Sequence, residues 1–442
     1  MLRDNMEINH QGHLVISGCD VTKLAAIYGT PLYILDEVLI RRACREYVTS
    51  FAALFEESQV LYAGKAFLTT GMCQIINEEG LGLDVVSGGE LYTALASGFP
   101  KEKIFFHGNN KSPEEIDFAL EADIGCFVVD NLWELELLNQ KAKAHQRRAR
   151  VLLRITPGVE AHTHVYVQTG QLDSKFGFGL AKGVAMEAVK RALAAEFIDW
   201  LGLHCHIGSQ ILDLECYSVA VDLMFDFMAQ IKEETGREVR ILDLGGGLGI
   251  RYTKEDQPKT PRQWAQHLAQ SVQEAARKYR LGIPKICVEP GRSIVGPAGS
   301  TLYTIGSIKH IPGIRTYVAV DGGMSDNPRV ALYDAKYEGI VANKAHQPCT
   351  QVVSVAGKCC ESGDMLIWDL PVPEVTAGDL LAVFATGAYN FSMASNYNRL
   401  LRPPVVLVNN GTHRLLVRGQ TYEDLIDDDL DLSDSGECSR VS

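Results

Sequence analysis

Several residues that could take part in catalysis stand at the ends of short apolar runs. Lys65 follows Val60–Ala63 after one glycine, His206 closes a similar run, and Glu289 closes another. Apolar runs of this length are typical of buried strands, and a charged side chain at such a strand end is costly unless it is paired or used. These three positions are therefore candidates for one chemical site.

Lys65 and Glu289 each suit one part of carbonyl chemistry. Burial in the mouth of a barrel would lower the pKa of the Lys65 amine, as Schiff-base formation requires, although a lysine at a rim can also extend its amine to solvent. Glu289 is separated from Arg292 by a Pro-Gly turn, and a salt-bridged strand end is the simpler interpretation of that stretch. If the cofactor is pyridoxal phosphate, a carboxylate facing the pyridine nitrogen keeps that nitrogen protonated and the ring electron-withdrawing.

A glycine run and two histidines add to this set. The run 245–247 follows another apolar stretch, and its backbone N–H groups could approach a phosphate, although glycine-rich turns are common. His204 and His206 share one face of a strand because side chains alternate along it. They could stack on an aromatic cofactor or be satisfied in the core; no third ligand completes a metal site, so no metal is predicted. Ser209 could donate to a phosphate or begin a turn.

The elements that would position these residues alternate between strands and helices. Eight apolar runs are the predicted strands: 60–63, 83–86, 104–107, 127–129, 151–155, 201–206, 241–244 and 286–289. Amphipathic segments separate them, notably 184–195, 217–234 and 264–279. This alternation predicts a (β/α)8 barrel, an α/β fold that carries its reactive groups at the C-terminal ends of the strands.

The chain changes character after Gly296. Short β-rich segments divided by Gly and Pro, without long helices, predict an antiparallel β domain that also takes in the N-terminal segment. The predicted division is a barrel over 36–296, a β domain over 1–35 and 297–421, and an acidic, disordered tail over 422–442.

Composition limits the class of protein. With 442 residues, of which 46% are hydrophobic and 22% charged, the chain is typical of a globular protein large enough for two domains. A net charge of −13 argues against nucleic-acid binding. Eleven scattered cysteines without zinc-ligand spacing favour reduced thiols and a cytoplasmic location. No apolar run reaches the roughly 18 residues of a membrane span, so no membrane insertion is expected.

The β domain holds further candidates. Cys360 and Glu361 stand in a turn-like segment, Cys-Cys-Glu-Ser-Gly-Asp, where a vicinal disulfide or inert thiols are the alternatives to a reactive thiol. Arg329 and Tyr333 lie four residues apart, and Tyr389 follows Ala-Thr-Gly-Ala. Each of these alone would be interpreted as a surface or packing residue.

Taken together, these motifs resemble those of the fold type III pyridoxal-phosphate decarboxylases, with their alanine racemase-like barrel, and specifically those of the diaminopimelate decarboxylase family. The resemblance extends from Leu32 to Val408. The motifs that carry it are Tyr-Ala-Gly-Lys, His-Cys-His-Ile-Gly-Ser-Gln, Leu-Gly-Gly-Gly-Leu-Gly, Glu-Pro-Gly-Arg, Cys-Glu-Ser-Gly-Asp and Gly-Ala-Tyr. The acidic tail is not part of this pattern.

The resemblance implies a pyridoxal 5'-phosphate enzyme that decarboxylates meso-2,6-diaminopimelate to L-lysine and CO2, the last step of lysine biosynthesis. It implies that Lys65 bonds covalently to the cofactor, His206 stacks on its ring and Glu289 binds its ring nitrogen. The residues implied to surround the phosphate are Ser209, Gly245, Gly246, Gly247 and Tyr389, with backbone contacts from Pro290, Gly291 and Arg292. Those implied to hold the substrate are Arg292, Arg329, Tyr333, Glu361 and Tyr389. Cys360 would be the proton donor after CO2 leaves, and Cys360 and Glu361 would act in the other barrel of a homodimer with shared active sites.

The residue types agree with this substrate. Two arginines and a glutamate suit a distal end that bears both a carboxylate and an ammonium group, whereas ornithine or arginine would need only an acidic group. A decarboxylase of another amino acid or of a carboxylated polyamine, on the same scaffold, is one alternative. A non-catalytic regulatory homologue is the other, although it would be expected to lack Lys65 or Cys360.

Overall fold

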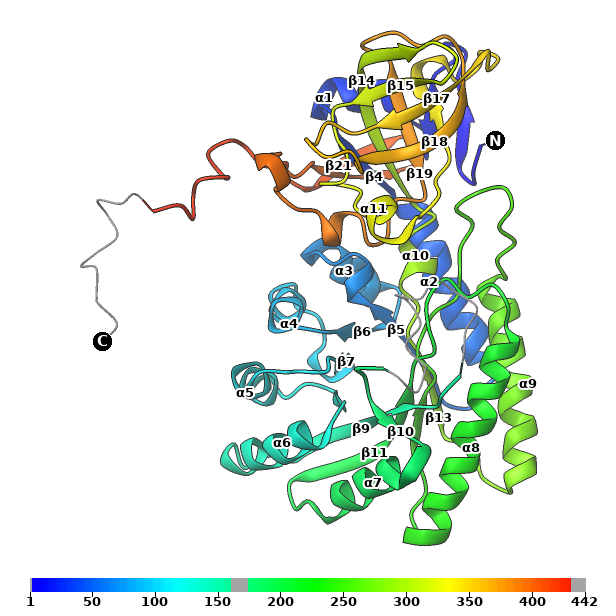
Figure 1. Cartoon of the computed structure of the whole chain (residues 1–442). Coiled ribbons are helices and arrows are strands. Elements are labelled where there is room, and N and C mark those ends of the chain that lie inside the picture. The colour runs from blue at the N-terminus through cyan, green and yellow to red at the C-terminus, as the bar shows by residue number, and fades with distance from the viewer. Residues whose placement is uncertain (1, 160–173, 431–442) are drawn as a thin grey trace.

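The protein, described from a computed structural model over residues 2–159 and 174–430, consists of a barrel with a β-rich domain above it in Figure 1. The barrel strands are β5 (Ser58–Ala63), β6 (Gly82–Val85), β7 (Ile104–Phe106), β8 (Cys126–Val129), β9 (Ala149–Thr156), β11 (Ile198–Cys205), β12 (Ile241–Asp243) and β13 (Lys285–Val288). They pair in parallel in this order, and β13 pairs with β5 to close the sheet. The predicted eight-stranded barrel is confirmed, and a short extra strand, β10 (Phe178–Gly179), adds to β9.

Helices surround the barrel because each has one apolar face. They are α2 (Glu37–Ala52), α3 (Thr70–Glu78), α4 (Gly88–Ala96), α5 (Pro113–Ala122), α6 (Leu132–Ala144), α7 (Val184–Ala194), α8 (Glu215–Thr235) and α9 (Pro261–Tyr279). In α9 the buried Trp264 packs edge-on against Tyr47 of α2 and Tyr217 of α8, so one indole ties three helices together. Capping boxes at Ser112 and Thr260 fix where α5 and α9 begin.

The interior of the barrel is closed by apolar side chains. Five buried residues from four strands form a cluster separate from the large core between strands and helices: Leu61, Phe105, Cys126, Val128 and Leu152. This packed interior leaves the C-terminal ends of the strands as the place where polar groups can gather.

The β domain is built from both ends of the chain. Its large sheet has the order β18 (Met365–Val372), β17 (Gln351–Ala356), β15 (Arg315–Val320), β14 (Gly299–Ile311), β4 (Leu32–Asp36), β20 (Val405–Asn409) and β21 (Thr412–Val417). Of two further strands, β19 (Leu380–Phe384) pairs with β14, and β16 (Gly339–Val341) pairs with β19. The first strands, β1 (Met6–Ile8), β2 (Leu14–Ile16) and β3 (Cys19–Asp20), form a small sheet of their own, before α1 (Val21–Tyr28).

Two pairings depart from the antiparallel arrangement expected from sequence. β15 pairs in parallel with β17, and β4 pairs in parallel with β20, while the remaining pairs of this domain are antiparallel. Two parallel strands need a long connection between them. Helices and loops connect β15 to β17, and the chain between β4 and β20 includes the whole barrel.

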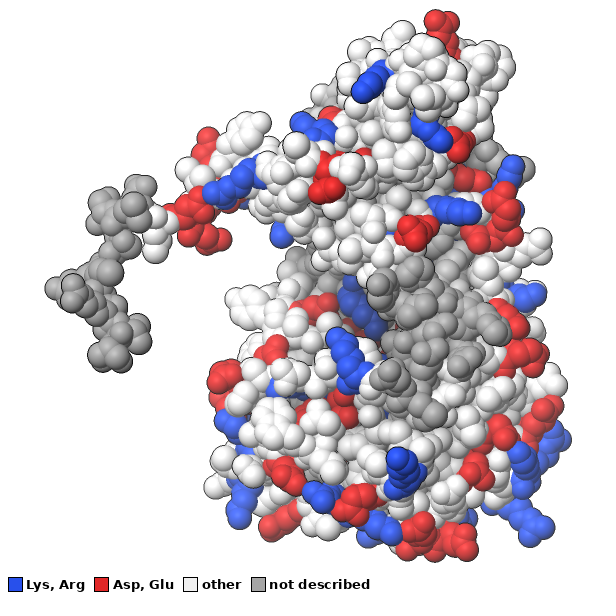
Figure 2. Space-filling view, in the orientation of Figure 1, with Lys and Arg blue, Asp and Glu red and all other residues white. Residues whose placement is uncertain are grey.

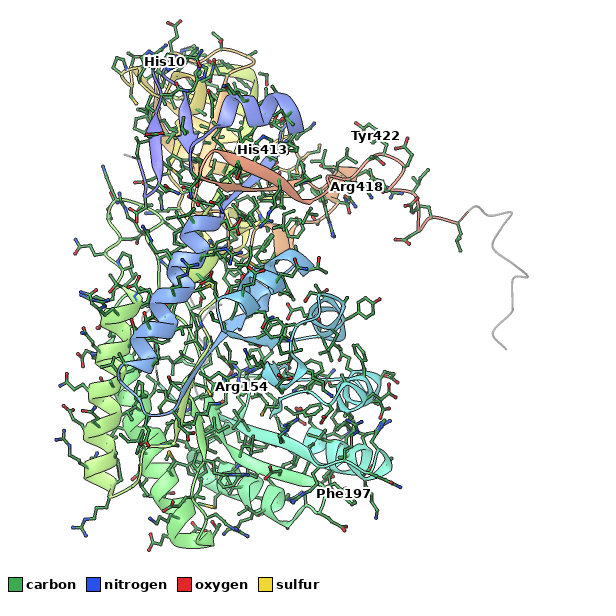
Figure 3. The ribbon with its side chains drawn as sticks, turned by 180° about the vertical axis from the view of Figure 1, so that it is seen from behind. His10, Arg154, Phe197, His413, Arg418 and Tyr422 are labelled. Atoms are coloured by element: carbon green, nitrogen blue, oxygen red, sulfur yellow. The ribbon has the colours of Figure 1, made fainter. Side chains whose placement is uncertain are left out.

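An arm leaves the β domain after β21. Figure 3 shows Arg418 and Tyr422 on this arm, to the side of the sheet. Arg418 of the arm pairs with Asp424, and Arg399, which precedes β20, pairs with Asp429, so residues 422–430 of the predicted tail form anchored turns. The remaining tail residues, 431–442, lie outside the described part of the chain.

Charges are mixed on the face shown in Figure 2, where acidic and basic side chains alternate over the barrel and the β domain. Searched over its described residues, the chain contains no helix both long and apolar enough to cross a bilayer.

Candidate active site

A cavity of about 670 Å³ lies where the C-terminal ends of the barrel strands meet the β domain. Side chains from both parts line it. The residues named from sequence that line this cavity are Lys65, His206, Ser209, Gly247, Glu289, Gly291, Arg292, Arg329, Tyr333 and Tyr389. The fold thus brings together positions that lie more than 300 residues apart in the chain.

Lys65 reaches the cavity from a single 3-10 turn (Gly64–Ala66) that follows β5. Protein atoms surround Lys65 on most sides, but its side chain is exposed because it faces the open cavity. Its neighbour Ala66 is buried. Burial lowers the pKa of the amine, but the nearby Asp84, Tyr389 and Glu289 raise it by more, so the net shift is upward. The prediction from sequence that the pKa of Lys65 is lowered is therefore wrong for the protein without a bound ligand.

Glu289 lies between two histidines at the end of β13. His107 Nε2 lies 2.8 Å from Glu289 Oε1, and His204 Nε2 lies 3.2 Å from Glu289 Oε2. His107 directly follows β7 and His204 belongs to β11, so three strands converge on one carboxylate. His107, His204 and Glu289 together offer three ligand atoms within 4.8 Å of one another, a grouping that the sequence did not reveal.

The charge states in this cluster follow from burial and contact. Burial raises the pKa of Glu289, but the two histidines outweigh it and hold the pKa well below its usual range. Burial lowers the pKa of His204 to about 4, so its ring is neutral and donates its Nε2–H to the carboxylate. Glu289 is therefore an ionised carboxylate at the cavity wall.

The glycine run after β12 packs against the loop after β11. The Gly246 N–H donates to His206 Nδ1 at 3.2 Å, and the Gly245 N–H donates to Asp243 Oδ1 at 2.9 Å. Both amides thus have acceptors within the chain, whereas Gly247 lines the cavity. Burial and the charge of Lys65 lower the pKa of His206 well below its usual range, so the His206 ring is neutral.

Two arginines meet in the cavity. Arg292 lies in the short helix α10 (Arg292–Val295) of the barrel, and Arg329 begins α11 (Arg329–Tyr333) of the β domain. Both donate to the hydroxyl oxygen of Tyr252, and Arg292 also donates to Ser209 at 2.9 Å. Within residues 2–159 and 174–430, neither guanidinium group has a carboxylate oxygen within 4.0 Å, and Arg292 Nε has no hydrogen-bond partner. Two buried cations without a counter-charge predict an anionic ligand.

Cys360 and Glu361 lie outside this cavity. Both are exposed, and the Cys360 N–H donates to Asn398 Oδ1 at 2.7 Å. The buried Asp364 shapes their loop by accepting the N–H groups of Cys359 and Met324. Both thiols of the Cys-Cys pair are free, so the vicinal disulfide considered from sequence is absent from this segment.

Sequence reasoning missed four residues around the site. His107 and Asp84 stand on predicted strands, so their position near the rim could have identified them. Arg154, inside the barrel in Figure 3, lies on β9 with its guanidinium 4.3 Å from the ring centre of Phe176. Tyr252 follows the glycine run at no strand end, and no local signal distinguishes it.

The donor set matches the groups of pyridoxal phosphate. An amine can bond to its aldehyde, an ionised carboxylate can bind its protonated ring nitrogen, and a neutral imidazole can stack on its ring. Ser209 and the backbone at Gly247 offer hydrogen-bond donors to a phosphate, and a side chain at Gly247 would collide with the Gly208 carbonyl oxygen. The residues present therefore fit this cofactor.

Comparison with known proteins gives one consistent result. Residues 38–296 match the family described as pyridoxal-dependent decarboxylase, pyridoxal binding domain. The chain is 54% identical over 422 residues to the diaminopimelate decarboxylase of Bacillus subtilis (strain 168), covering 96% of each protein. It is 42% identical to that of Staphylococcus aureus (strain COL), covering 96% of this chain and 99% of the relative. The crystal structure of diaminopimelate decarboxylase from M. jannaschii with L-lysine superposes with a TM-score of 0.89 at 39% identity, covering 97% of this chain and 99% of the other.

Proposed function

Because the chain belongs to the diaminopimelate decarboxylase family of pyridoxal-dependent decarboxylases, we propose that it converts meso-2,6-diaminopimelate to L-lysine and CO2, the last step of lysine biosynthesis. The protein is a carboxy-lyase that uses pyridoxal 5'-phosphate. The relatives that carry this name extend over nearly the whole chain, including the β domain that supplies Arg329.

The observation that carries the substrate assignment is the pair Arg292 and Arg329. Both are buried in the cavity that also holds Lys65 and Glu289, and neither has a carboxylate partner among the described residues. A substrate with a plain distal ammonium group, such as ornithine, would place a third positive charge beside them. A distal carboxylate instead supplies the missing counter-charge, and arginine binds carboxylates with two parallel hydrogen bonds.

When bound, pyridoxal phosphate withdraws electrons from the substrate α-carbon, so that CO2 can leave. Lys65 would hold it at the aldehyde, Glu289 at the ring nitrogen and His206 against the ring. Ser209, Gly247 and Tyr389, with the backbone of 290–292, would surround its phosphate, and Gly245 and Gly246, whose N–H groups bond within the chain, would shape the turn beside it. Because the carboxylate of Glu289 is ionised, it would keep a proton on the ring nitrogen.

Arg292, Arg329, Tyr333 and Tyr389 orient the substrate from this subunit. Cys360 and Glu361 complete the site from the partner subunit of a homodimer, and this part of the proposal is supported by their exposure and their absence from the cavity lining of their own subunit. There the Cys360 thiol donates its proton to the α-carbon after CO2 has left, and Glu361 binds the distal ammonium group.

The enzyme acts in the cytoplasm. Ten cysteines occur in the described residues and all are free thiols, as expected for a reducing compartment.

Turnover of separate amino acids tests the assignment. The purified protein is incubated with pyridoxal phosphate and meso-diaminopimelate, and in parallel with ornithine and arginine, while CO2 and the amino-acid product are measured. We expect L-lysine from diaminopimelate and no CO2 from the other two. Release of CO2 from free ornithine or free arginine would contradict the role proposed for Arg292 and Arg329. A bound cofactor without turnover of any substrate would favour a regulatory protein.

A further inference from the structure

Tyr252 joins the two arginines of the cavity. Its hydroxyl oxygen accepts hydrogen bonds from Arg292 Nη1 at 2.5 Å and from Arg329 Nη1 at 2.8 Å. One arginine comes from the barrel and the other from the β domain, so this oxygen lies at the junction of the two parts. We propose that Tyr252 is a specificity-determining residue that fixes the spacing of the two guanidinium groups and donates its own O–H to the distal carboxylate of the substrate.

The shared oxygen sets the distance between two like charges. Since both Nη1 atoms are hydrogen-bonded to it, they can be no farther apart than 5.3 Å, the sum of the two bond lengths. Two guanidinium groups at this separation repel each other unless an acceptor or an anion lies between them. The lone pairs of the Tyr252 hydroxyl provide that acceptor in the protein alone.

The hydroxyl proton is left for the ligand. A tyrosine hydroxyl has one donor and can accept from two partners, and both accepting positions are taken by the arginines. The two cations repel the O–H proton, so the O–H bond points away from them. Tyr252 lines the cavity, and the group best suited to accept this proton beside two guanidinium groups is a carboxylate.

The loop that carries Tyr252 is held from several sides. The Tyr252 N–H donates to Asp256 Oδ2 at 3.0 Å, and the Tyr252 carbonyl accepts from Arg3 Nη2 at 2.6 Å. The ring packs edge-on against Tyr337, with 5.5 Å between ring centres, and only 7% of the residue is exposed. The hydroxyl is therefore fixed in place before any ligand arrives, which lowers the entropic cost of binding.

This role rests on the proposed function, because it needs a ligand with a distal carboxylate. The product L-lysine keeps that carboxylate with its ammonium group, whereas cadaverine is the same carbon chain with no carboxylate at all. Tyr252 should therefore affect the binding of L-lysine and leave the binding of cadaverine unchanged.

The substitution Tyr252→Phe tests this, because it removes one oxygen atom and keeps the ring against Tyr337. We expect the inhibition constant of L-lysine and the KM of meso-diaminopimelate to rise about 10- to 100-fold, as for loss of a hydrogen bond to a charged group. The inhibition constant of cadaverine and kcat should stay within about threefold. Thermal unfolding and cofactor absorbance measured on the same samples should match the unsubstituted protein.

The matched control is Tyr337→Phe. Tyr337 also accepts from Arg329 Nη1 at 2.8 Å, but it is not among the residues that line the cavity, so its loss should change each constant by less than about threefold. An unchanged L-lysine constant in the Tyr252 variant, an equal loss for cadaverine, or an equal effect of Tyr337→Phe would overturn the proposal. If the unsubstituted protein does not turn over diaminopimelate, the proposed function fails, yet calorimetric binding of L-lysine and cadaverine still tests Tyr252.

Discussion

Two buried carboxyl groups near the cavity have opposite charge states. The histidines beside Glu289 hold its pKa well below the usual range in spite of burial, whereas burial and the charge of Glu289 raise the pKa of Asp243 well above its usual range. Two close carboxylates cannot both ionise in a dry interior, so one of them keeps its proton. The ionised one is Glu289, which lines the cavity and can serve a protonated ring nitrogen.

Lys65 gives the sharpest prediction for a single residue. Replacing it with alanine removes the only amine proposed to bond to the cofactor, and we expect activity to fall by at least about 1,000-fold with loss of the visible absorbance of the lysine-bound cofactor. Lys65→Arg is the matched control, because arginine keeps the positive charge among Asp84 and Glu289 but cannot form that bond. Activity in either variant above a few per cent would contradict the role.

At the scale of elements, helix α4 carries a carboxyl that is costly to ionise. Glu90 Oε2 accepts the Val86 N–H at 2.8 Å, and burial raises the pKa of Glu90 to about 7. The folded state therefore binds this proton more tightly than the unfolded chain does. Stability should fall as the pH rises from about 4.5 to about 7, the reverse of the behaviour of a paired carboxylate.

Glu90→Gln removes the cost of ionising a buried carboxyl group and keeps a side-chain oxygen that can accept the Val86 N–H. We expect the melting temperature to rise by about 1–4 °C at pH 8 and to stay unchanged at pH 4.5. Thermal unfolding at the two pH values measures this, with the exposed Glu121→Gln of α5 as control. A gain of equal size at both pH values would show that the effect does not come from ionisation.

The turn after β12 depends on glycine for a backbone reason. Gly247 has a φ of +109°, and a Cβ there would collide with the Gly208 carbonyl oxygen. Gly247→Ala should therefore displace the loops after β11 and β12 and weaken pyridoxal phosphate binding by about tenfold or more, as expected for a few kcal/mol of strain. Titration with pyridoxal phosphate, followed by absorbance, measures the affinity for the cofactor. Gly282→Ala is the control, because a Cβ at Gly282 meets nothing within 4 Å, and this variant should bind the cofactor with unchanged affinity.

At the scale of the whole molecule, the proposed site takes residues from two subunits, because the proposed proton donor does not line the cavity that holds Lys65. Lys65 lines the cavity, whereas the exposed Cys360 lies outside it. If the partner subunit supplies the thiol, a mixed dimer of Lys65→Ala and Cys360→Ala subunits contains one site with both groups intact. Mixing the two inactive variants should then restore about a quarter of full activity, the statistical limit for random pairing in a two-fold symmetric dimer.

Size-exclusion chromatography and activity of the mixture measure this complementation. Mixing Lys65→Ala with Lys65→Arg is the control and should restore nothing. A monomer in solution, or no recovery in the mixed sample, would mean that Cys360 does not act across an interface.

Local sequence patterns are enough to predict the barrel and part of the cavity. Periodic apolar runs identify the strands, and in a barrel of parallel strands every C-terminal end meets at one rim. Lys65, His206 and Glu289 stand at such ends, so their types and positions sufficed to place them together before any contact was known.

How these groups act on one another depends on contacts that form only in the folded protein. Two histidines from other strands set the charge of Glu289, neighbouring acids raise the pKa of Lys65 instead of lowering it, and the Tyr252 hydroxyl joins arginines from two parts of the molecule. Hydrogen bonds and electrostatic shifts depend on distances of a few ångströms between segments far apart in the chain. Local periodicity carries no information about such distances, and only the packing of the barrel against the β domain fixes them.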